Sequence, residues 1–111
     1  MLSDRIAEKL GESPAEDGVS ALLRLVTVAQ GDSGQCRYVR RFLLGLYNGA
    51  EWPFNLNSLR AIDSNLQDDA LRVLQMDMTP HREVHEYIKD GDALFREWWH
   101  WERNNEKENW E

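Results

Sequence analysis

The chain has 111 residues, a formal net charge of −7 and a single cysteine, Cys36, so it is long enough for one domain with a hydrophobic core and has no intramolecular disulfide. An acidic chain is repelled by phosphate, which disfavours general binding to nucleic acids. No segment has the roughly 20 apolar residues of a membrane span or the apolar core of a signal peptide, so we expect a soluble, cytoplasmic protein that needs no metal to fold.

The spacing of apolar residues predicts an all-α protein, a compact bundle of about five to six short helices with no convincing strand. Residues 3–10 are expected to form a short helix, and a Gly- and Pro-containing linker follows, although Pro14 also suits the first position of a helix. Residues 19–30 are apolar on most sides, as is typical of a central helix. We therefore place an N-terminal helix and linker at 1–18, a single helical domain at 19–104 and an acidic tail at 105–111.

The segment Gly31-Asp32-Ser33-Gly34-Gln35 is expected to connect two helices. Apolar residues recur at three and four positions from residue 36 to 48, which predicts a helix directly after it. Gly31 is the expected end of the preceding helix. Asp32 is the expected N-cap of the next one, and Gln35 would complete a capping box worth about 1 kcal/mol.

The same segment is similar to the nucleophile segment of trypsin-like serine proteases. A nucleophilic Ser33 would need a histidine base, for which the chain offers His81, His85 and His100. In the proteases, however, the motif lies in a loop of a much larger β fold, whereas here it opens a helix. We therefore expect no catalytic residue and no enzymatic activity.

Three arginines, Arg37, Arg40 and Arg41, share the face of the helix over 36–48 that lies opposite its apolar residues. A charge cluster of this kind is usually a solvated outer face. The alternative is a small arginine patch that serves an acidic partner or the protein's own acidic helices.

The middle of the chain predicts one long helix after a break. Because a residue before proline favours an extended backbone, Trp52 and Phe54 are expected to lie along the surface of the core. Asn57 is the expected cap of a short turn, and Asp63 or Ser64 that of the long helix. The inward face of this helix should comprise Leu66, Ala70, Val73, Leu74 and Met78, with Asp68, Arg72 and Gln75 facing away.

A short helix over 81–89 would place His81 above His85, with the spacing of the zinc-binding H-E-x-x-H motif. Arg82 stands where that motif requires glutamate, and a cation opposes metal binding. A third ligand would have to come from Glu86, His100 or a remote acid, and nothing in the spacing specifies it. We therefore expect neither a metal site nor another cofactor.

The last predicted helix, over 93–104, carries more aromatic and apolar surface than a simple surface helix needs to bury. It is either a core helix with large side chains or a surface for a partner or a second copy of the chain. Glu97 and Glu102 flank the rings and disfavour stacking on nucleic-acid bases. Its apolar residues are Leu94, Trp98 and Trp101 on one face and Phe95 and Trp99 on an adjacent face.

Part of the chain resembles an uncharacterised family of small domains. The residues that carry the resemblance are the run from Leu22 to Gln35, then Val39, Phe42-Leu43-Leu44, Tyr47-Asn48, Asp63 and residues 69–74. That family is associated with proteobacterial plasmids, integrative conjugative elements and prophages, and its pattern is an A-x-G-D-[ST]-G-Q corner, an F-L-L helix ending near Trp-Asn and a D-x-x-V-L helix. The resemblance covers about residues 20–85. The chain departs from it at Leu46-Tyr47-Asn48, where the family has Trp-Trp-Asn, and the C-terminal helix is not matched.

The resemblance implies a bacterial mobile genetic element, whose small accessory proteins often bind a host machine, as anti-CRISPR proteins do. We therefore expect a non-catalytic protein that inhibits or modulates a host nucleic-acid-handling complex, for example a CRISPR effector, by placing acidic surface against basic surface. Direct contact with nucleic acid or membrane is not expected. The alternative is a homodimeric regulatory or accessory protein that self-associates through its aromatic C-terminal helix. The residues predicted to contact the partner are Asp63, Asp68, Asp69, Glu97, Trp98, Trp99, Trp101, Glu102 and Glu106.

Overall fold

The computed structural model describes residues 14–106, which form four α-helices and two 3-10 helices and contain no strand. The all-α prediction is confirmed, and no helix in this range is long and apolar enough to cross a membrane. The helix expected over 3–10 lies outside the described residues, as does most of the acidic tail. The elements are α2 (Pro14–Ala29), α3 (Gly34–Tyr47), η1 (Leu56–Ala61), α4 (Ser64–Met78), η2 (Val84–Tyr87) and α5 (Gly91–Asn104).

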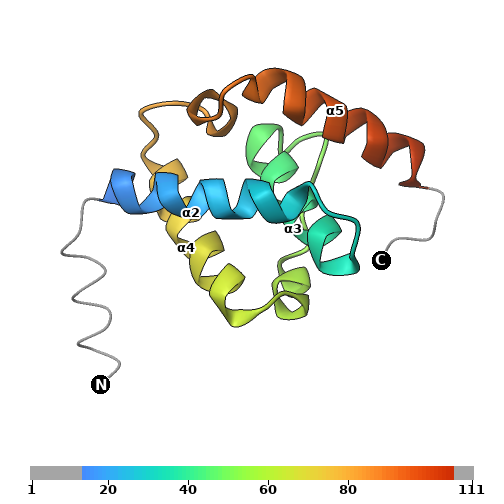
Figure 1. Cartoon of the computed structure of the whole chain (residues 1–111), viewed down its shortest axis with the longest axis horizontal. Coiled ribbons are helices and arrows are strands. Elements are labelled where there is room, and N and C mark those ends of the chain that lie inside the picture. The colour runs from blue at the N-terminus through green and yellow to red at the C-terminus, as the bar shows by residue number, and fades with distance from the viewer. Residues whose placement is uncertain (1–13, 107–111) are drawn as a thin grey trace.

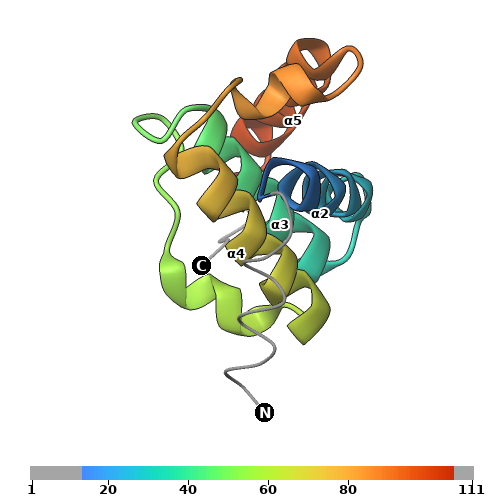
Figure 2. The same cartoon turned by 90° about the vertical axis from the view of Figure 1, so that its left-hand side faces the viewer.

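Helix α2 is the central element, as its apolar surface predicts. It packs against α4 and α3, which both lie behind it in Figure 1, α4 across its N-terminal half and α3 towards its C-terminal end. Helix α5 lies against α3 and η2, apart from α4 (Figure 2). The helix begins at Pro14, the alternative start that suits a proline without a backbone N–H, and so crosses the boundary expected at residue 19.

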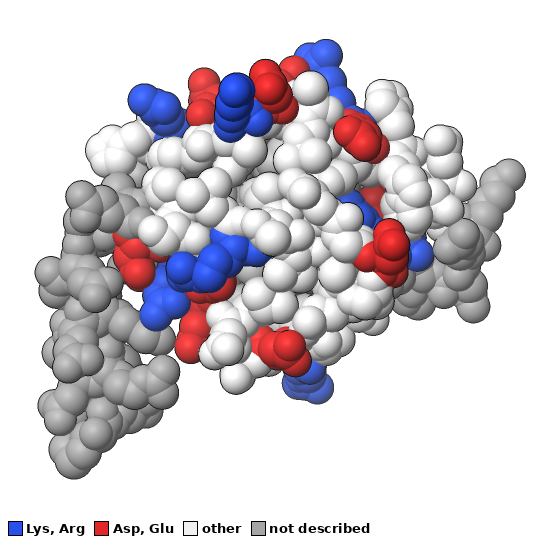
Figure 3. Space-filling view, viewed as in Figure 1, with Lys and Arg blue, Asp and Glu red and all other residues white. Residues whose placement is uncertain are grey.

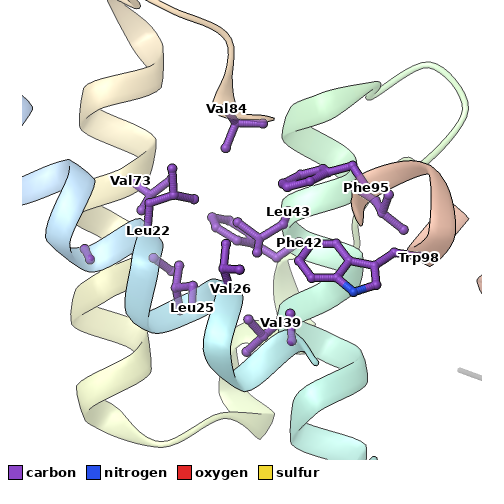
Figure 4. Close-up of a cluster of buried hydrophobic side chains, with 14 of the residues drawn as sticks. Leu22, Leu25, Val26, Val39, Phe42, Leu43, Val73, Val84, Phe95 and Trp98 are labelled. Carbon is purple, nitrogen blue, oxygen red and sulfur yellow. The ribbon is translucent and has the colours of Figure 1, made fainter. Parts of the chain in front are cut away.

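All four helices contribute side chains to one hydrophobic core, and Figure 4 shows them converging between the ribbons. Val84 of η2 closes the top of this cluster in that view. Trp52, expected to lie along the surface of the core, belongs to the same cluster and is only 2% exposed, since a large ring gains much from burial. The other core residues labelled in Figure 4 are Leu22, Leu25 and Val26 of α2, Val39, Phe42 and Leu43 of α3, Val73 of α4, and Phe95 and Trp98 of α5.

The inward face of α4 ends on Met76, whereas the predicted Met78 is 76% exposed. Met76 lies where α2 crosses α4, directly against Gly18. Met78 is the last residue of α4, so its side chain has passed the crossing point.

The helix connection at residues 30–33 is confirmed, but its caps differ from the prediction. The hydroxyl of Ser33, not the carboxylate of Asp32, accepts from the backbone N–H of Cys36 and caps α3. Gln35 turns away from the cap: its side-chain oxygen accepts from the backbone N–H of Asp63 at 2.6 Å, and its amide donates to the Asp63 carboxylate at 3.3 Å. The corner residue Gln35 therefore fixes the start of α4.

Of the two other predicted caps, one is displaced to a neighbouring residue and one is confirmed. Asn55, not Asn57, caps η1 by accepting from the backbone N–H of Asn57. Asp63 is the N-cap of α4 without a side-chain cap bond, because its carboxylate is engaged by Gln35.

Replacing Gly18 by alanine tests the crossing of α2 and α4. A Cβ atom at Gly18 would lie 2.8 Å from the Met76 Cβ, so we expect Gly18→Ala to lower the free energy of unfolding by roughly 1–3 kcal/mol, despite the higher helix propensity of alanine. Gly34→Ala is the matched control, because nothing lies within 4 Å of its Cβ position. Urea denaturation of both variants gives the comparison, and a Gly18→Ala variant as stable as Gly34→Ala would contradict the close crossing.

Candidate protein-binding site

A fully buried carboxylate, that of Glu102 in α5, accepts hydrogen bonds from three arginines of α3. Arg37 Nη2 lies 3.1 Å and Arg41 Nε 2.8 Å from Oε1, and Arg40 Nε lies 2.9 Å from Oε2. Such charge-assisted bonds compensate for removing the carboxylate from water. We refer to these four residues as the Glu102 cluster.

The Glu102 cluster arises because a glutamate takes a core position on α5. The buried residues of this helix are Gly91, Phe95, Trp98 and Glu102, a single stripe with spacings of four, three and four. The expectation that the arginines form a solvated outer face is wrong, and pairing with the protein's own acidic helix is what the structure contains.

Arg40 also joins the Glu102 cluster to the end of α2. Its Nη1 donates to the carbonyl oxygens of Ala29 at 2.8 Å and Gly31 at 3.2 Å. The last carbonyls of a helix have no partner within the helix, so Arg40 satisfies groups that would otherwise be left unpaired. One side chain thus connects α2, α3 and α5.

The electrostatics of the cluster keep Glu102 ionised. Burial alone would raise the pKa of Glu102, but hydrogen bonds from Arg37, Arg40 and Arg41 outweigh burial and hold that pKa below its usual value. The side chain is therefore a carboxylate in the folded protein at neutral pH.

Trp101 lies at the surface beside the Glu102 cluster, with 43% of its area exposed. The guanidinium carbons of Arg37 and Arg40 lie 5.0 Å and 4.8 Å from its ring centroid. At these distances a cation is attracted to the face of an indole ring. Because both arginines are fixed by Glu102, the exposed ring is held in place.

A hollow of about 410 Å³ opens next to Trp101, between the α2–α3 corner and α5. Asp32 and Glu97 are exposed at this hollow, whereas Arg40 is buried in it. Its lining thus combines two accessible carboxylates with aromatic and aliphatic surface. We call it the Trp101 groove, and its lining residues are Gln30, Asp32, Arg40, Leu94, Glu97, Trp98 and Trp101.

The other tryptophans of α5 are mostly internal. Trp98 is buried with its ring 4.8 Å from that of Phe95. Trp99 is half-buried and meets the rings of Trp52 at 5.7 Å and Tyr47 at 6.1 Å in edge-to-face geometry. Trp98 therefore serves mainly the core, and the 5% of its area that stays exposed leaves it little surface to offer where it lines the Trp101 groove.

Asp69, also predicted to face a partner, is only 3% exposed. It receives both Nε and Nη2 of Arg24 across the α2–α4 crossing, at 3.0 Å and 2.8 Å, and Nη1 of Arg72 at 3.2 Å. Arg72 reaches back to Asp17 of α2 at 2.9 Å. Asp69 and Glu102 are therefore internal anchors that hold helices together, and neither offers a carboxylate to a partner.

The remaining predicted residues do not form one continuous acidic surface. Asp63 is exposed at the start of α4, Asp68 is half-buried one turn later, and Glu106 forms a surface ion pair with Arg103 at 3.0 Å. Figure 3 shows acidic and basic side chains interspersed over one face, with uncharged surface between them and no continuous acidic area. Of the predicted set, the Trp101 groove brings together Glu97, Trp101 and the buried Trp98. Asp32, which sequence reasoning assigned to a cap, lines the same groove.

The groups considered for catalysis and metal binding have other contacts. The Ser33 hydroxyl caps α3 and lies 3.1 Å from the Cys36 sulfur. Only Val84–Tyr87 is helical around the histidines and it is a 3-10 helix, so His81 and His85 do not lie one above the other on an α-helix. His85 packs edge-on against Tyr47 at 5.0 Å, and residues 14–106 bring no three His, Cys, Asp or Glu side chains together as a metal site.

A family model described as a family of unknown function, DUF7673, matches residues 19–103. The match agrees with the resemblance over residues 20–85 to an uncharacterised small domain and extends it through α5, which the resemblance did not cover. It therefore includes Glu102, its three arginines and the whole Trp101 groove. Searches of curated proteins and of solved structures found no match.

Replacing Glu102 by glutamine tests the Glu102 cluster. A carboxamide cannot accept from three guanidinium groups and adds an N–H₂ that faces them, so the free energy of unfolding should fall by roughly 3–5 kcal/mol. Glu97→Gln on the exposed side of the same helix is the matched control, and it should change the free energy of unfolding by less than about 0.5 kcal/mol. Equal urea midpoints for the two variants would show that Glu102 is dispensable.

The stability difference between wild type and Glu102→Gln should depend on pH. Because the folded-state pKa of Glu102 is lowered, its contribution is fully present above the usual value of 4.5 and is lost as the pH falls through the lower folded-state value. Urea denaturation from pH 7 to pH 3 should give a constant difference down to about pH 5 and a shrinking one below it. A difference that grows on acidification would contradict the lowered pKa.

Proposed function

The chain belongs to the DUF7673 family of unknown function, and we propose that it is a non-catalytic binding protein of the cytoplasm. In this proposal it docks onto a basic surface of a host protein or ribonucleoprotein complex and inhibits or modulates it. The contact is made by the Trp101 groove.

The observation that carries the proposal is a half-exposed tryptophan that lines the same hollow as two residues with exposed carboxylates. Tryptophan is enriched at the energetic centres of protein interfaces, because a large ring gains much from burial and has few rotatable bonds. Asp32 and Glu97 beside Trp101 complement lysine or arginine side chains of a partner.

The net charge of −7 supports the same kind of partner. Exposed acids outside the groove, among them Asp63 and Glu106, would attract a basic surface at long range without contacting it. Association should therefore slow as the salt concentration rises.

The resemblance to proteins of plasmids, conjugative elements and prophages supports a host complex that handles nucleic acid as the partner. Such complexes hold DNA or RNA in basic channels, and an acidic protein that occupies a channel excludes the nucleic acid. A CRISPR effector is the specific case that we propose to test first.

The burial of the aromatic helix weighs against self-association as the main function. Trp98 is buried and Trp99 packs on Tyr47 and Trp52, so only Trp101 of these three rings would be available to a second copy. A single exposed ring suits an anchor in a partner's surface better than a symmetric aromatic interface.

Charge reversal at Glu97 tests the proposal. Partners captured from the bacterial host with the wild-type protein are purified, and their affinity is measured for wild type, Glu97→Lys and Glu51→Lys. Glu51 forms an ion pair with Arg103. Arg103 is two residues after Trp101 and therefore lies on the opposite side of α5. Glu51→Lys thus makes the same change in charge away from the groove and serves as the control.

We expect Glu97→Lys to weaken partner binding at least about tenfold, and Glu51→Lys to keep the affinity within about threefold of wild type. The reason is that, of these two glutamates, only Glu97 lines the groove. Sedimentation of wild type should show a monomer under the same conditions. Equal affinities of the two variants, or a purified partner without a basic surface, would contradict the proposed contact.

A further inference from the structure

We infer that the Trp101 groove receives the side chain of one arginine from the partner, an assignment that rests on the proposed function and makes it specific. The groove volume of about 410 Å³ lies within the range of sites that enclose small ligands, so it has room for a side chain rather than only a flat contact. The question is which side chain its lining fits best.

The lining offers a separate contact for each part of an arginine. The exposed indole of Trp101 provides a flat surface for stacking, and Leu94 and Trp98 provide apolar surface for the methylene stem. The carboxylates of Asp32 and Glu97 are available to the guanidinium N–H groups.

Arginine fits this lining better than lysine does. A guanidinium group is planar, less strongly hydrated than an ammonium group, and able both to stack on an aromatic ring and to donate two parallel bonds to a carboxylate. The protein already uses this chemistry: Arg41 and Arg103 lie 4.8 Å and 4.3 Å from the ring centroid of Trp52, and Arg103 also binds the Glu51 carboxylate at 2.9 Å. The groove offers a similar combination of groups, an indole ring and nearby carboxylates, to the guanidinium group of a partner protein.

Arg40 at the base of the groove is the one lining residue that opposes a cation. It is only 6% exposed, its Nε is bound by Glu102, and its Nη1 is bound by the carbonyls of Ala29 and Gly31. An incoming side chain therefore meets the exposed Asp32 and Glu97 first.

The test uses two blocked tripeptides, N-acetyl-Gly-Arg-Gly-amide and N-acetyl-Gly-Lys-Gly-amide, titrated into the full ¹⁵N-labelled chain. Both peptides carry one positive charge, so the lysine peptide measures charge attraction alone. The indole N–H resonance of Trp101, assigned with Trp101→Phe, reports on the groove.

We expect the arginine peptide to shift this resonance in the millimolar range and to bind at least about threefold more tightly than the lysine peptide. Glu97→Gln should weaken the arginine peptide at least about threefold, whereas Glu51→Gln should not change it. Both variants alter exposed residues, so both proteins should remain folded.

Equal affinities of the two peptides, or an unchanged affinity in Glu97→Gln, would overturn the arginine assignment. If the peptides fail in this way while Glu97→Lys still weakens binding of the purified partner at least about tenfold, the proposed function stands and only the arginine assignment is wrong. If Glu97→Lys also leaves partner binding intact, both are wrong.

Discussion

The buried carboxylate of Glu102 fixes the position of α5, and the exposed features of that helix depend on it. A buried carboxylate with three guanidinium partners contributes less net stability than its short distances suggest, because all four groups lose their hydration. Its effect is on specificity: any arrangement that displaces α5 from α3 leaves charges buried without partners. Asp69 has the same relation to Arg24 and Arg72 at the α2–α4 crossing. The apolar core supplies the driving force for folding. The carboxylates of Glu102 and Asp69 determine how the helices are aligned against one another.

The same contacts explain why a large aromatic ring stays at the surface in one orientation. Arg37 and Arg40 lie on Trp101 and are themselves bound by Glu102, so the ring is positioned from below by residues that cannot move independently. An anchor residue that is already ordered loses little conformational entropy on binding. The groove beside this positioned ring is thus suited to recognition by shape and charge.

The helices were predictable from the sequence because apolar periodicity reports burial directly, and the helix connection at 30–33 follows from its turn residues. The Glu102 cluster was not predicted, since a glutamate in an apolar stripe and arginines on a polar face are both assigned to solvent by default. The signal was present in the spacing of Gly91, Phe95, Trp98 and Glu102, which places Glu102 on the core stripe. The groove could not be derived in this way, because Asp32 and Glu97 belong to segments that only the tertiary fold brings together.

The central claim is that Glu102 and its arginines act as one unit, and a double-mutant cycle between Arg40 and Glu102 tests it most directly. Arg40→Met, Glu102→Gln and the double variant are compared with wild type by urea denaturation at pH 7. We predict a coupling energy of at least about 1.5 kcal/mol, because removing either partner already disrupts the contacts of the other. Additive effects, within about 0.5 kcal/mol, would mean that the two residues are energetically independent and would contradict this account.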